Sequence, residues 1–354
     1  MSEPEARVAR WTEERRELAT RATREARGSK RAAGERRNMN ILIWHVHGSW
    51  TTAFVQGPHT YLVPVTPDRG PDGLGRARTW EWPGTVKEVS PDELRDLDVD
   101  VVIAQRPHEP ELARTWTGRD LPLVYLEHNA PDGDVPLTRH PLADRPDALI
   151  VHVTHFNDLL WDCGSTPTRV VEHGIVDPGA LWTGELARTA VVTNEPLRRG
   201  RYVGADLLPY FAEAGPLDVF GMGVADVPER LGLPGAQAFE DLPQDRMHAE
   251  VARRRVYLHP VRWTSLGLSL LEAMHLGMPV VAFGTTEVAE AVPPDAGVVS
   301  TDRAVLRAAV ARLLADPAEA AERGAAARRA ALGRYGLDRF LADWEAILPA
   351  AAAR

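Results

Sequence analysis

The chain has 354 residues, 44% of them hydrophobic, and a formal net charge of −9 at pH 7. This length predicts two domains, and the hydrophobic content excludes a globally disordered protein. The acidic balance excludes nucleic acid as the main partner, because binding a phosphate backbone requires clustered Lys and Arg in excess.

One cysteine, Cys163, excludes internal disulfides and cysteine-based metal sites, which favours a reducing, cytoplasmic location. No run approaches 18 consecutive apolar residues, and the N-terminus lacks the apolar segment of a signal peptide. We therefore expect no transmembrane segment, with peripheral membrane contact left open. Lysine occurs only at Lys30 and Lys87 while arginine is abundant, a bias typical of a GC-rich bacterial genome.

Residues 1–38 are rich in Arg, Glu and Ala and carry almost no large apolar side chains. Such a segment forms at most a solvated helix with ion pairs between residues four apart. We predict an appended, disordered tail. Met39 directly precedes the first strand, so a start codon assigned too far upstream is an alternative to a functional basic arm.

Residues 39–180 are typical of a first Rossmann-like domain. The segment Asn40–His47 predicts a buried strand that ends in a loop at Gly48. Because ligands gather at the carboxyl ends of parallel strands, this loop is a candidate wall of a cleft. The Pro- and Gly-rich segment 60–89 predicts short strands and a long loop, where acceptor specificity could reside. The further elements predicted here are strands at 99–104, 121–128 and 147–154 and helices at 109–116 and 156–164.

Histidines in this first domain are candidates for chemistry. His128 follows a predicted strand, where a polar residue is expected to face the cleft, although a single His at a strand end is somewhat more often structural than catalytic. His45, His47 and His59 have no carboxylates at ligand spacing beside them, so we predict no metal site.

Residues 186–335 are typical of a second Rossmann-like domain, after a hinge at 178–186. A polar loop with Arg198, Arg199 and Gly200 follows its first strand. The other predicted elements are strands at 190–193, 217–223, 256–260 and 297–300 and helices at 205–211, 245–254, 286–291, 302–315 and 317–332. Residues 336–354 have the apolar spacing of an amphipathic helix.

The stretch Arg262–Phe283 carries the most information. It predicts a helix that begins at Ser265 as the N-cap and ends at Gly277, followed by a buried strand. The small residues Thr264, Ser265 and Gly267 would let a phosphate approach the free N–H groups at the positive end of the helix. Glu272 lies one turn beyond Leu268, where a carboxylate suits two sugar hydroxyls better than an anion. An ordinary buried helix with a locally paired Glu272 fits the same residues equally well.

The run SLGLSLLEAMHLGMPVVA within this stretch resembles the donor-site signature of glycosyltransferase family 4. The resemblance covers residues 40–350, with specific motifs only in the second half. It implies the α/β fold class GT-B: two Rossmann-like domains with parallel sheets face each other across a cleft, and a C-terminal helix crosses back to the first domain. It also implies a retaining enzyme.

The resemblance assigns roles in donor binding. Glu272 matches the Glu that holds the ribose hydroxyls. Thr264 stands where a first Glu contacts the transferred sugar, and Gly48 is what remains of a Gly-Gly pair near the diphosphate. Arg199 aligns with a phosphate-binding Lys, which a bidentate guanidinium can replace. The remaining implied donor contacts are Asn194 in place of an Arg, Gly221 beneath the nucleobase, and the N–H groups of Gly267, Leu268 and Ser269.

For the reacting centre, the resemblance places His128 near the transferred sugar or the acceptor. It implies front-face displacement, in which the departing phosphate takes the proton of the acceptor. Arg199 and the helix end would stabilise the leaving diphosphate, so we expect neither metal nor other cofactor. A solvated loop remains the alternative for Arg198 and Arg201.

The sequence thus predicts a hexosyltransferase-type glycosyltransferase. Its expected partners are a nucleotide-sugar donor and a glycan, glycolipid or small-molecule acceptor. The departures at Thr264, Asn194 and Gly48 favour a second hypothesis, a degenerate GT-B protein that binds nucleotide or glycan without catalysis. A third is a GT-B enzyme of other chemistry, such as an epimerase or a phosphorylase. The short chain and the lack of a cofactor lysine disfavour the phosphorylase.

Overall fold

A computed structural model describes residues 38–353, and residues 39–354 form one compact unit. The predicted tail at 1–38 lies outside the described residues except for Asn38. Within the described part of the chain, no helix is long and apolar enough to span a membrane.

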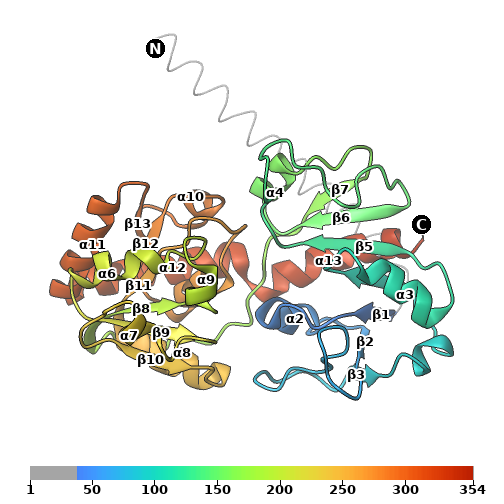
Figure 1. Cartoon of the computed structure of the whole chain (residues 1–354), viewed down its shortest axis with the longest axis horizontal. Coiled ribbons are helices and arrows are strands. Elements are labelled where there is room, and N and C mark those ends of the chain that lie inside the picture. The colour runs from blue at the N-terminus through green and yellow to red at the C-terminus, as the bar shows by residue number, and fades with distance from the viewer. Residues whose placement is uncertain (1–37, 354) are drawn as a thin grey trace, which may run out of the picture. The chain divides into compact units, whose positions relative to one another are not determined.

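The first half of the chain forms a sheet of seven parallel strands, in the order β3-β2-β1-β4-β5-β6-β7. We call this sheet and its helices the first lobe (Figure 1). The central strands are buried along their length, as expected of parallel strands covered on both faces. The strands are β1 (Asn40–Ile43), β2 (Thr60–Pro64), β3 (Val86–Val89), β4 (Val101–Ala104), β5 (Leu123–Glu127), β6 (Ala148–His152) and β7 (Thr168–Val170). The helices are α2 (Gly48–Phe54), the 3-10 turn η1 (Glu93–Arg95), α3 (Glu109–Thr117) and α4 (His155–Leu160).

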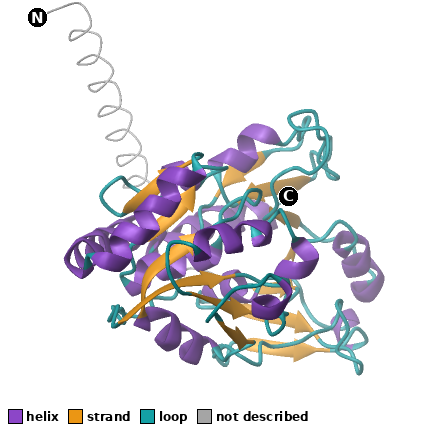
Figure 2. Cartoon of the chain, turned by 60° about the vertical axis from the view of Figure 1, so that its left-hand side comes forward, coloured by secondary structure: helices purple, strands orange, loops and turns teal. Residues whose placement is uncertain are grey.

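The second half forms a sheet of six parallel strands, in the order β10-β9-β8-β11-β12-β13, which with its helices is the second lobe. Figure 2 shows helices on both sides of the strands. The strands are β8 (Leu186–Val192), β9 (Leu217–Gly221), β10 (Gln237–Glu240), β11 (Arg254–His259), β12 (Val280–Phe283) and β13 (Gly297–Ser300). The helices are α5 (Pro196–Arg199), η2 (Ala205–Leu207), α6 (Leu208–Ala212), α7 (Val227–Arg230), α8 (Gln244–Arg253), α9 (Leu268–Leu276), α10 (Val288–Ala291), α11 (Arg303–Ala315) and α12 (Pro317–Tyr335).

In both sheets the strand order reverses beside the strand that comes first in sequence. β1 lies between β2 and β4, and β8 lies between β9 and β11. In open parallel sheets, ligands bind outside the carboxyl ends of the strands at such a reversal. The fold therefore directs attention to the segments that follow β1, β4, β8 and β11.

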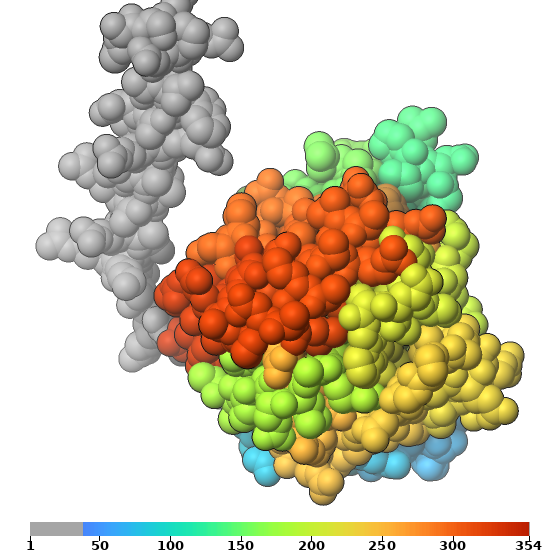
Figure 3. All heavy atoms as spheres, turned by 90° about the vertical axis from the view of Figure 1, so that its left-hand side faces the viewer, coloured from blue at the N-terminus to red at the C-terminus, as the bar shows by residue number. Residues whose placement is uncertain are grey.

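The last helix, α13 (Leu337–Ala352), returns to the first lobe after α12 has packed against the second (Figure 1). Its apolar side chains Phe340, Trp344 and Leu348 are buried in the core of the first sheet. The ring of Trp344 packs edge-on against Trp50 and Phe54, at centroid distances of 5.7 and 4.9 Å. In the space-filling view of Figure 3, the orange-to-red C-terminal part of the chain, which includes α11 and α12, covers much of one face. The predicted fold class, including the returning helix, is confirmed, whereas the domain boundaries stay a prediction.

Two predicted boundaries in the first half were wrong. β1 ends at Ile43 instead of His47, because the next backbone carbonyl, that of Trp44, accepts a hydrogen bond from the Gln105 side chain instead of a neighbouring strand. The predicted loop at Gly48 is the first turn of α2.

Two further elements in the second half also differ from the prediction. The polar loop with Arg198 and Arg199 is the short helix α5, which Pro196 favours because its fixed φ suits the first helical position. Helix α9 begins at Leu268 with Gly267 as the N-cap, so Ser265 is not the cap. The Ser265 hydroxyl instead donates a hydrogen bond to the carbonyl of His128 in the first lobe. The predicted stop at Gly277 is confirmed, with φ of 88°.

Buried histidines make the fold sensitive to acid. Burial lowers the pKa of His152 and His259 to about 4, and burial together with the neighbouring His47 lowers that of His173 to about 3. These imidazoles are therefore neutral in the folded protein at pH 7, whereas in the unfolded chain they titrate near pH 6.5.

We expect the Trp344→Ala variant to lose about 3–5 kcal/mol in the free energy of unfolding, because it removes a ring that fills the core of the first lobe. Urea titration followed by circular dichroism measures this loss. Leu159→Ala on α4, where the side chain is 79% exposed, should change it by less than about 0.5 kcal/mol. Equal unfolding midpoints for wild type and Trp344→Ala would show that α13 is not part of this core.

Stability should fall as the pH drops from 6.5 towards 4. The pKa values of these histidines are lower in the folded than in the unfolded protein, so the unfolded chain binds more protons between pH 6.5 and 4. Each such histidine therefore lowers the free energy of unfolding by about 1.4 kcal/mol per pH unit in this window. Urea midpoints at pH 7.5, 6.5, 5.5 and 4.5 test this. A midpoint that stays constant from pH 6.5 to 4.5 contradicts it.

Candidate functional site

The N-terminus of α9 lies beyond the end of β11, beside the reversal point of the second sheet. Its N-cap, Gly267, has an extended backbone, and no side chain caps the helix. Among the described residues, the N–H groups of Gly267, Leu268 and Ser269 have no hydrogen-bond acceptor. Gly267 packs directly on His259: a Cβ atom there would lie 2.4 Å from Cε1 of that ring. The N-terminus of α9 therefore presents backbone N–H groups without covering side chains. This arrangement suits an anion at the positive end of a nine-residue helix.

Three residues predicted to bind the donor at the N-terminus of α9 have different contacts. Leu268 packs against the hydrophobic cores of both lobes. The Ser269 hydroxyl accepts a hydrogen bond from the Tyr257 hydroxyl at 3.0 Å and lies 3.5 Å from the carbonyl of Val192 at the end of β8. Thr264 is half-buried, and its hydroxyl has no hydrogen-bond partner within the described part of the chain.

Glu272 is buried one turn into α9, and its carboxylate joins the two lobes. Oε1 accepts a hydrogen bond from the hydroxyl of Ser49 on α2 at 2.6 Å. Oε2 accepts from Nε2 of Gln244 on α8 at 3.1 Å, and Nε2 of His248 lies 3.5 Å away. The carboxylate therefore lies at the lobe junction with both oxygens already in contact with donors.

Asn194 and Gly221 lie together at the ends of β8 and β9. The Asn194 side-chain oxygen accepts a hydrogen bond from the N–H of Met222 at 3.0 Å. Gly221 has φ of +134°, and a Cβ there would lie 2.2 Å from the carbonyl oxygen of Thr193. Asn194 thus fixes the turn after Gly221. Unlike the Arg of the family pattern at this position, it supplies no positive charge.

Arg199 differs from the arginines next to it. Arg198 pairs with Glu195, and Arg201 pairs with Asp206 at 3.2 Å. Arg199 is half-buried, and its guanidinium forms no ion pair among residues 38–353, although the charge of the nearby Glu195 acts on it. Burial, followed by the charge of Arg198, lowers its pKa, yet a guanidinium remains charged at neutral pH. A half-buried charge without a partner is suited to binding an anion.

His128 lies at the end of β5 as predicted, and its orientation is fixed. Its Nε2 lies 3.0 Å from Oε1 of Gln105, whose Nε2 donates to the carbonyl of Trp44 at 2.8 Å. The amide oxygen of Gln105 must therefore accept, so His128 carries its proton on Nε2 and leaves Nδ1 as an acceptor. Burial, followed by His47 and His173, lowers the pKa of His128 well below its usual value.

Three neutral imidazoles gather at this edge of the first sheet. The ring centroids of His47 and His128 are 4.1 Å apart, and the rings of His128 and His173 are nearly parallel at 6.4 Å. Neither ring nitrogen of the buried His173 has a hydrogen-bond partner within the described residues. Burial and then the charge of Arg199 lower the pKa of His47 to about 4, so Arg199 acts on this cluster from the second lobe.

The histidines that invited a metal hypothesis have separate partners. Nδ1 of His45 lies 3.2 Å from the carbonyl of Gly75, whereas Nε2 of His59 lies 2.7 Å from the carboxylate of Glu345. Among the described residues, no three His, Cys, Asp or Glu side chains are grouped to hold a metal ion.

Sequence reasoning missed Ser49, Gln244 and His248 as neighbours of Glu272. Gln244 and His248 are four residues apart on α8, with their Nε2 atoms 2.8 Å apart, so that spacing was a usable signal. Ser49 is 223 residues from Glu272 in sequence, and no local pattern connects the two.

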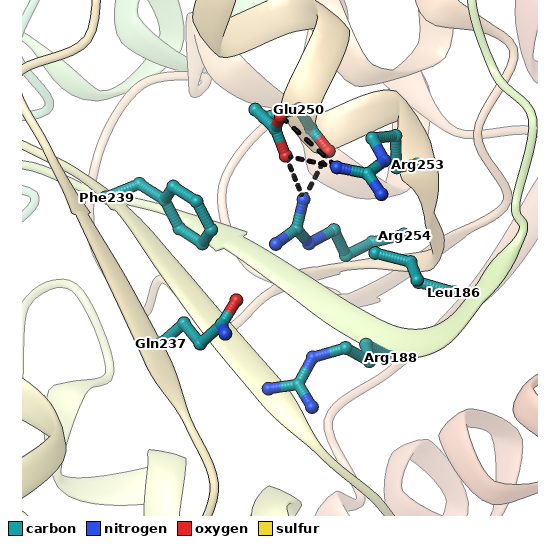
Figure 4. Close-up of a pocket in the computed structure, with 7 residues that line it drawn as sticks. All are labelled: Leu186, Arg188, Gln237, Phe239, Glu250, Arg253 and Arg254. Atoms are coloured by element: carbon teal, nitrogen blue, oxygen red, sulfur yellow. Dashed lines mark hydrogen bonds and ion pairs between the residues drawn. The ribbon is translucent and has the colours of Figure 1, made fainter.

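A cavity of about 450 Å³ lies at the opposite edge of the second sheet, at the starts of β8, β10 and β11 (Figure 4). Its arginines are paired: Arg188 and Arg254 with the buried Asp218, and Arg253 with Glu250. Because these charges are already compensated, we assign the residues around the cavity a structural role, as an ion-pair network at the starts of the strands.

Residues 219–316 match the model of the family described as glycosyl transferases group 1. This segment contains Gly221, α9 and Glu272. No curated protein matches the chain in sequence.

Solved structures of low sequence identity share the fold of the whole described chain. Sucrose-phosphate synthase from Thermosynechococcus elongatus has 13% identity and a TM-score of 0.65, over 89% of this chain and 100% of that one. Anabaena Alr3699/HepE, in complex with UDP and glucose, has 17% identity and a TM-score of 0.62, over 88% and 100%. A glycosyltransferase from Rickettsia africae has 13% identity and a TM-score of 0.60, over 89% and 99%.

At these identities the likeness to solved structures shows the fold alone. Two parallel sheets with a returning C-terminal helix, together with the family match, lead to one conclusion. The chain has the GT-B fold, and residues 219–316 in its second lobe match the glycosyl transferases group 1 model.

Proposed function

We propose that the protein is a retaining glycosyltransferase that takes its sugar from a nucleoside diphosphate sugar. The observation that carries this proposal is the N-terminus of α9. Free backbone N–H groups open the helix, and the buried carboxylate of Glu272 follows one turn later. A diphosphate on the helix end and a ribose on the carboxylate fit this order of groups.

Positive charge for the leaving diphosphate comes from the protein in this proposal. Arg199 and the N–H groups of Gly267, Leu268 and Ser269 stabilise the developing negative charge, so no metal ion is needed. The departing phosphate takes the proton of the acceptor by front-face displacement. His128, with Nδ1 as an acceptor, contacts a hydroxyl of the transferred sugar or of the acceptor.

A UDP-hexose is our first candidate for the donor. Anabaena Alr3699/HepE, which shares the fold, was solved with UDP-glucose. The acceptor is a glycan, a glycolipid or a small molecule that binds the first lobe.

A second candidate function is a GT-B protein that binds nucleotide or glycan without transfer. One observation favours it: both oxygens of Glu272 already have hydrogen-bond donors, Ser49 and Gln244. Thr264 and Asn194 also replace charged residues of the family pattern.

Thermal-shift binding of UDP, GDP, ADP, dTDP and their sugars separates these functions, followed by a donor-hydrolysis assay with the tightest binder. A shift with slow hydrolysis supports the transferase. A shift without hydrolysis supports the binder, and no shift with any nucleotide contradicts both the transferase and the nucleotide-binding form of the second candidate.

Glu272→Gln should weaken UDP binding by about tenfold or more, because hydrogen bonds to a charged group contribute about 1.5–3 kcal/mol. Wild type should also prefer UDP over 2′-deoxy-UDP, and the variant should lose this preference. Isothermal titration measures both. Glu287→Gln is the matched control: Glu287 is also buried and spans the lobes, through the N–H of Phe156 at 2.9 Å. If that variant loses the preference equally, Glu272 is not the ribose acceptor.

Arg199→Ala should weaken UDP binding about tenfold or more, whereas Arg198→Ala should change it less than about threefold. Arg198 is exposed and already paired with Glu195, and exposed ion pairs contribute little. Titration at low and moderate salt checks both variants, because only the loss of a phosphate contact reduces the salt dependence. Equal effects of the two variants would contradict a phosphate-binding role for Arg199.

A further inference from the structure

His47 occupies the N-cap position of α2, after β1 and beside the reversal point of the first sheet. The residue is half-buried, and its ring nitrogens form no hydrogen bond within residues 38–353. Its ring packs against that of His128 at 4.1 Å. An imidazole with unused nitrogens at this position can still bind a ligand.

The charged and titratable neighbours of His47 come from five segments. These are Arg199 of α5, Arg106 after β4, His128 after β5, His173 after β7 and His45 of its own segment. None of these five is acidic, but two carboxylates, Glu109 and Asp72, pair with Arg106 at 2.7 and 3.0 Å. A third, Glu272, accepts a hydrogen bond from Ser49, two residues along the chain from His47. Burial and then Arg199 hold the pKa of His47 at about 4, so its ring is neutral at pH 7 without ligand.

A bound nucleoside diphosphate sugar would change the charge near His47 from positive to negative. Each of its two phosphates carries a negative charge, and Arg199 supplies one positive charge. A phosphate bound to Arg199 cancels the cation that most disfavours a charged His47 and brings an anion into its surroundings. Nearby opposite charge favours the protonated imidazole.

We propose that His47 takes up a proton from solvent when a nucleoside diphosphate sugar binds, and that the resulting imidazolium donates a hydrogen bond to the diphosphate. This inference rests on the proposed function, because it places the diphosphate at Arg199. The donor is then held by one cation from each lobe. When the sugar–phosphate bond breaks, its electron pair stays on the phosphate oxygen, and an imidazolium already in place stabilises that added charge.

The other two imidazoles of the cluster are poorer candidates for this proton. His128 already uses its Nε2 proton on Gln105, and its charged neighbours do not include Arg199. His173 is 1% exposed, and the cation that acts on it is Arg339 of α13. Only His47 combines unused nitrogens, partial exposure and the influence of Arg199.

Isothermal titration with UDP-glucose at pH 6.0 tests the proposal, in MES and Bis-Tris buffers, whose ionisation enthalpies differ. UDP-glucose is chosen over UDP because a terminal phosphate has its own ionisation near pH 6, whereas the phosphates of the sugar nucleotide do not. The observed heat should depend on the buffer and correspond to uptake of about 0.7–1 proton per site. Affinity should also increase by about threefold or more from pH 8 to pH 6, since binding then consumes a proton.

His47→Asn should abolish the proton uptake and flatten the pH dependence of the affinity. Asn is a favoured N-cap residue, so α2 should still form, and an unchanged thermal unfolding midpoint at pH 8 verifies this. His45→Asn is the matched control: His45 is the adjacent histidine and contacts the Gly75 carbonyl, so uptake should persist.

A second readout is the imidazole NMR signal of His47, assigned by its loss in His47→Asn. Its titration midpoint should rise on adding UDP-glucose. Binding with no proton uptake, or with the same uptake in His47→Asn, would overturn the inference while leaving the proposed donor site intact. Absence of UDP-glucose binding would overturn the UDP-hexose donor and the inference together.

Discussion

The hydrogen bond between Ser49 and Glu272 is the contact on which the candidate site depends. A buried carboxylate is costly unless donors satisfy it, and Glu272 is only 5% exposed. Its donors come from α2 of the first lobe and α8 of the second. The site is therefore assembled only when the lobes are in contact, and neither Rossmann-like sheet could build it alone.

The same junction explains why the site is rich in uncompensated positive potential. Elsewhere in the second lobe, Arg188 and Arg254 are both paired with the buried Asp218. At the junction, by contrast, Arg199 forms no ion pair, and the first N–H groups of α9 have no acceptor among the described residues. An anion entering between the lobes would meet partners already oriented and not engaged with other groups, which limits the cost of rearrangement on binding.

The features that the sequence predicted well depend on local patterns. Buried parallel strands, the stop at Gly277 and the amphipathic α13 follow from hydrophobic spacing and from the backbone freedom of glycine. The errors depend on distant contacts. Ser265 has the chemistry of an N-cap, but its hydroxyl contacts His128, 137 residues away. Glu272 could be identified from its position on α9, whereas Ser49 could not, since its partner is 223 residues away and local spacing gives no sign of it.

The lobes contribute different kinds of groups to the junction. The second lobe supplies a fixed charge, Arg199, and fixed dipoles at the start of α9. The first lobe supplies His47, His128 and His173, whose charge depends on what lies beside them. Its fixed cation near this cluster, Arg106, is already compensated by Glu109 and Asp72. Uncompensated fixed positive charges on both sides would repel each other across the junction and oppose the contact between Ser49 and Glu272. Neutral imidazoles avoid that repulsion in the ligand-free protein and still allow a second positive charge once an anion is bound.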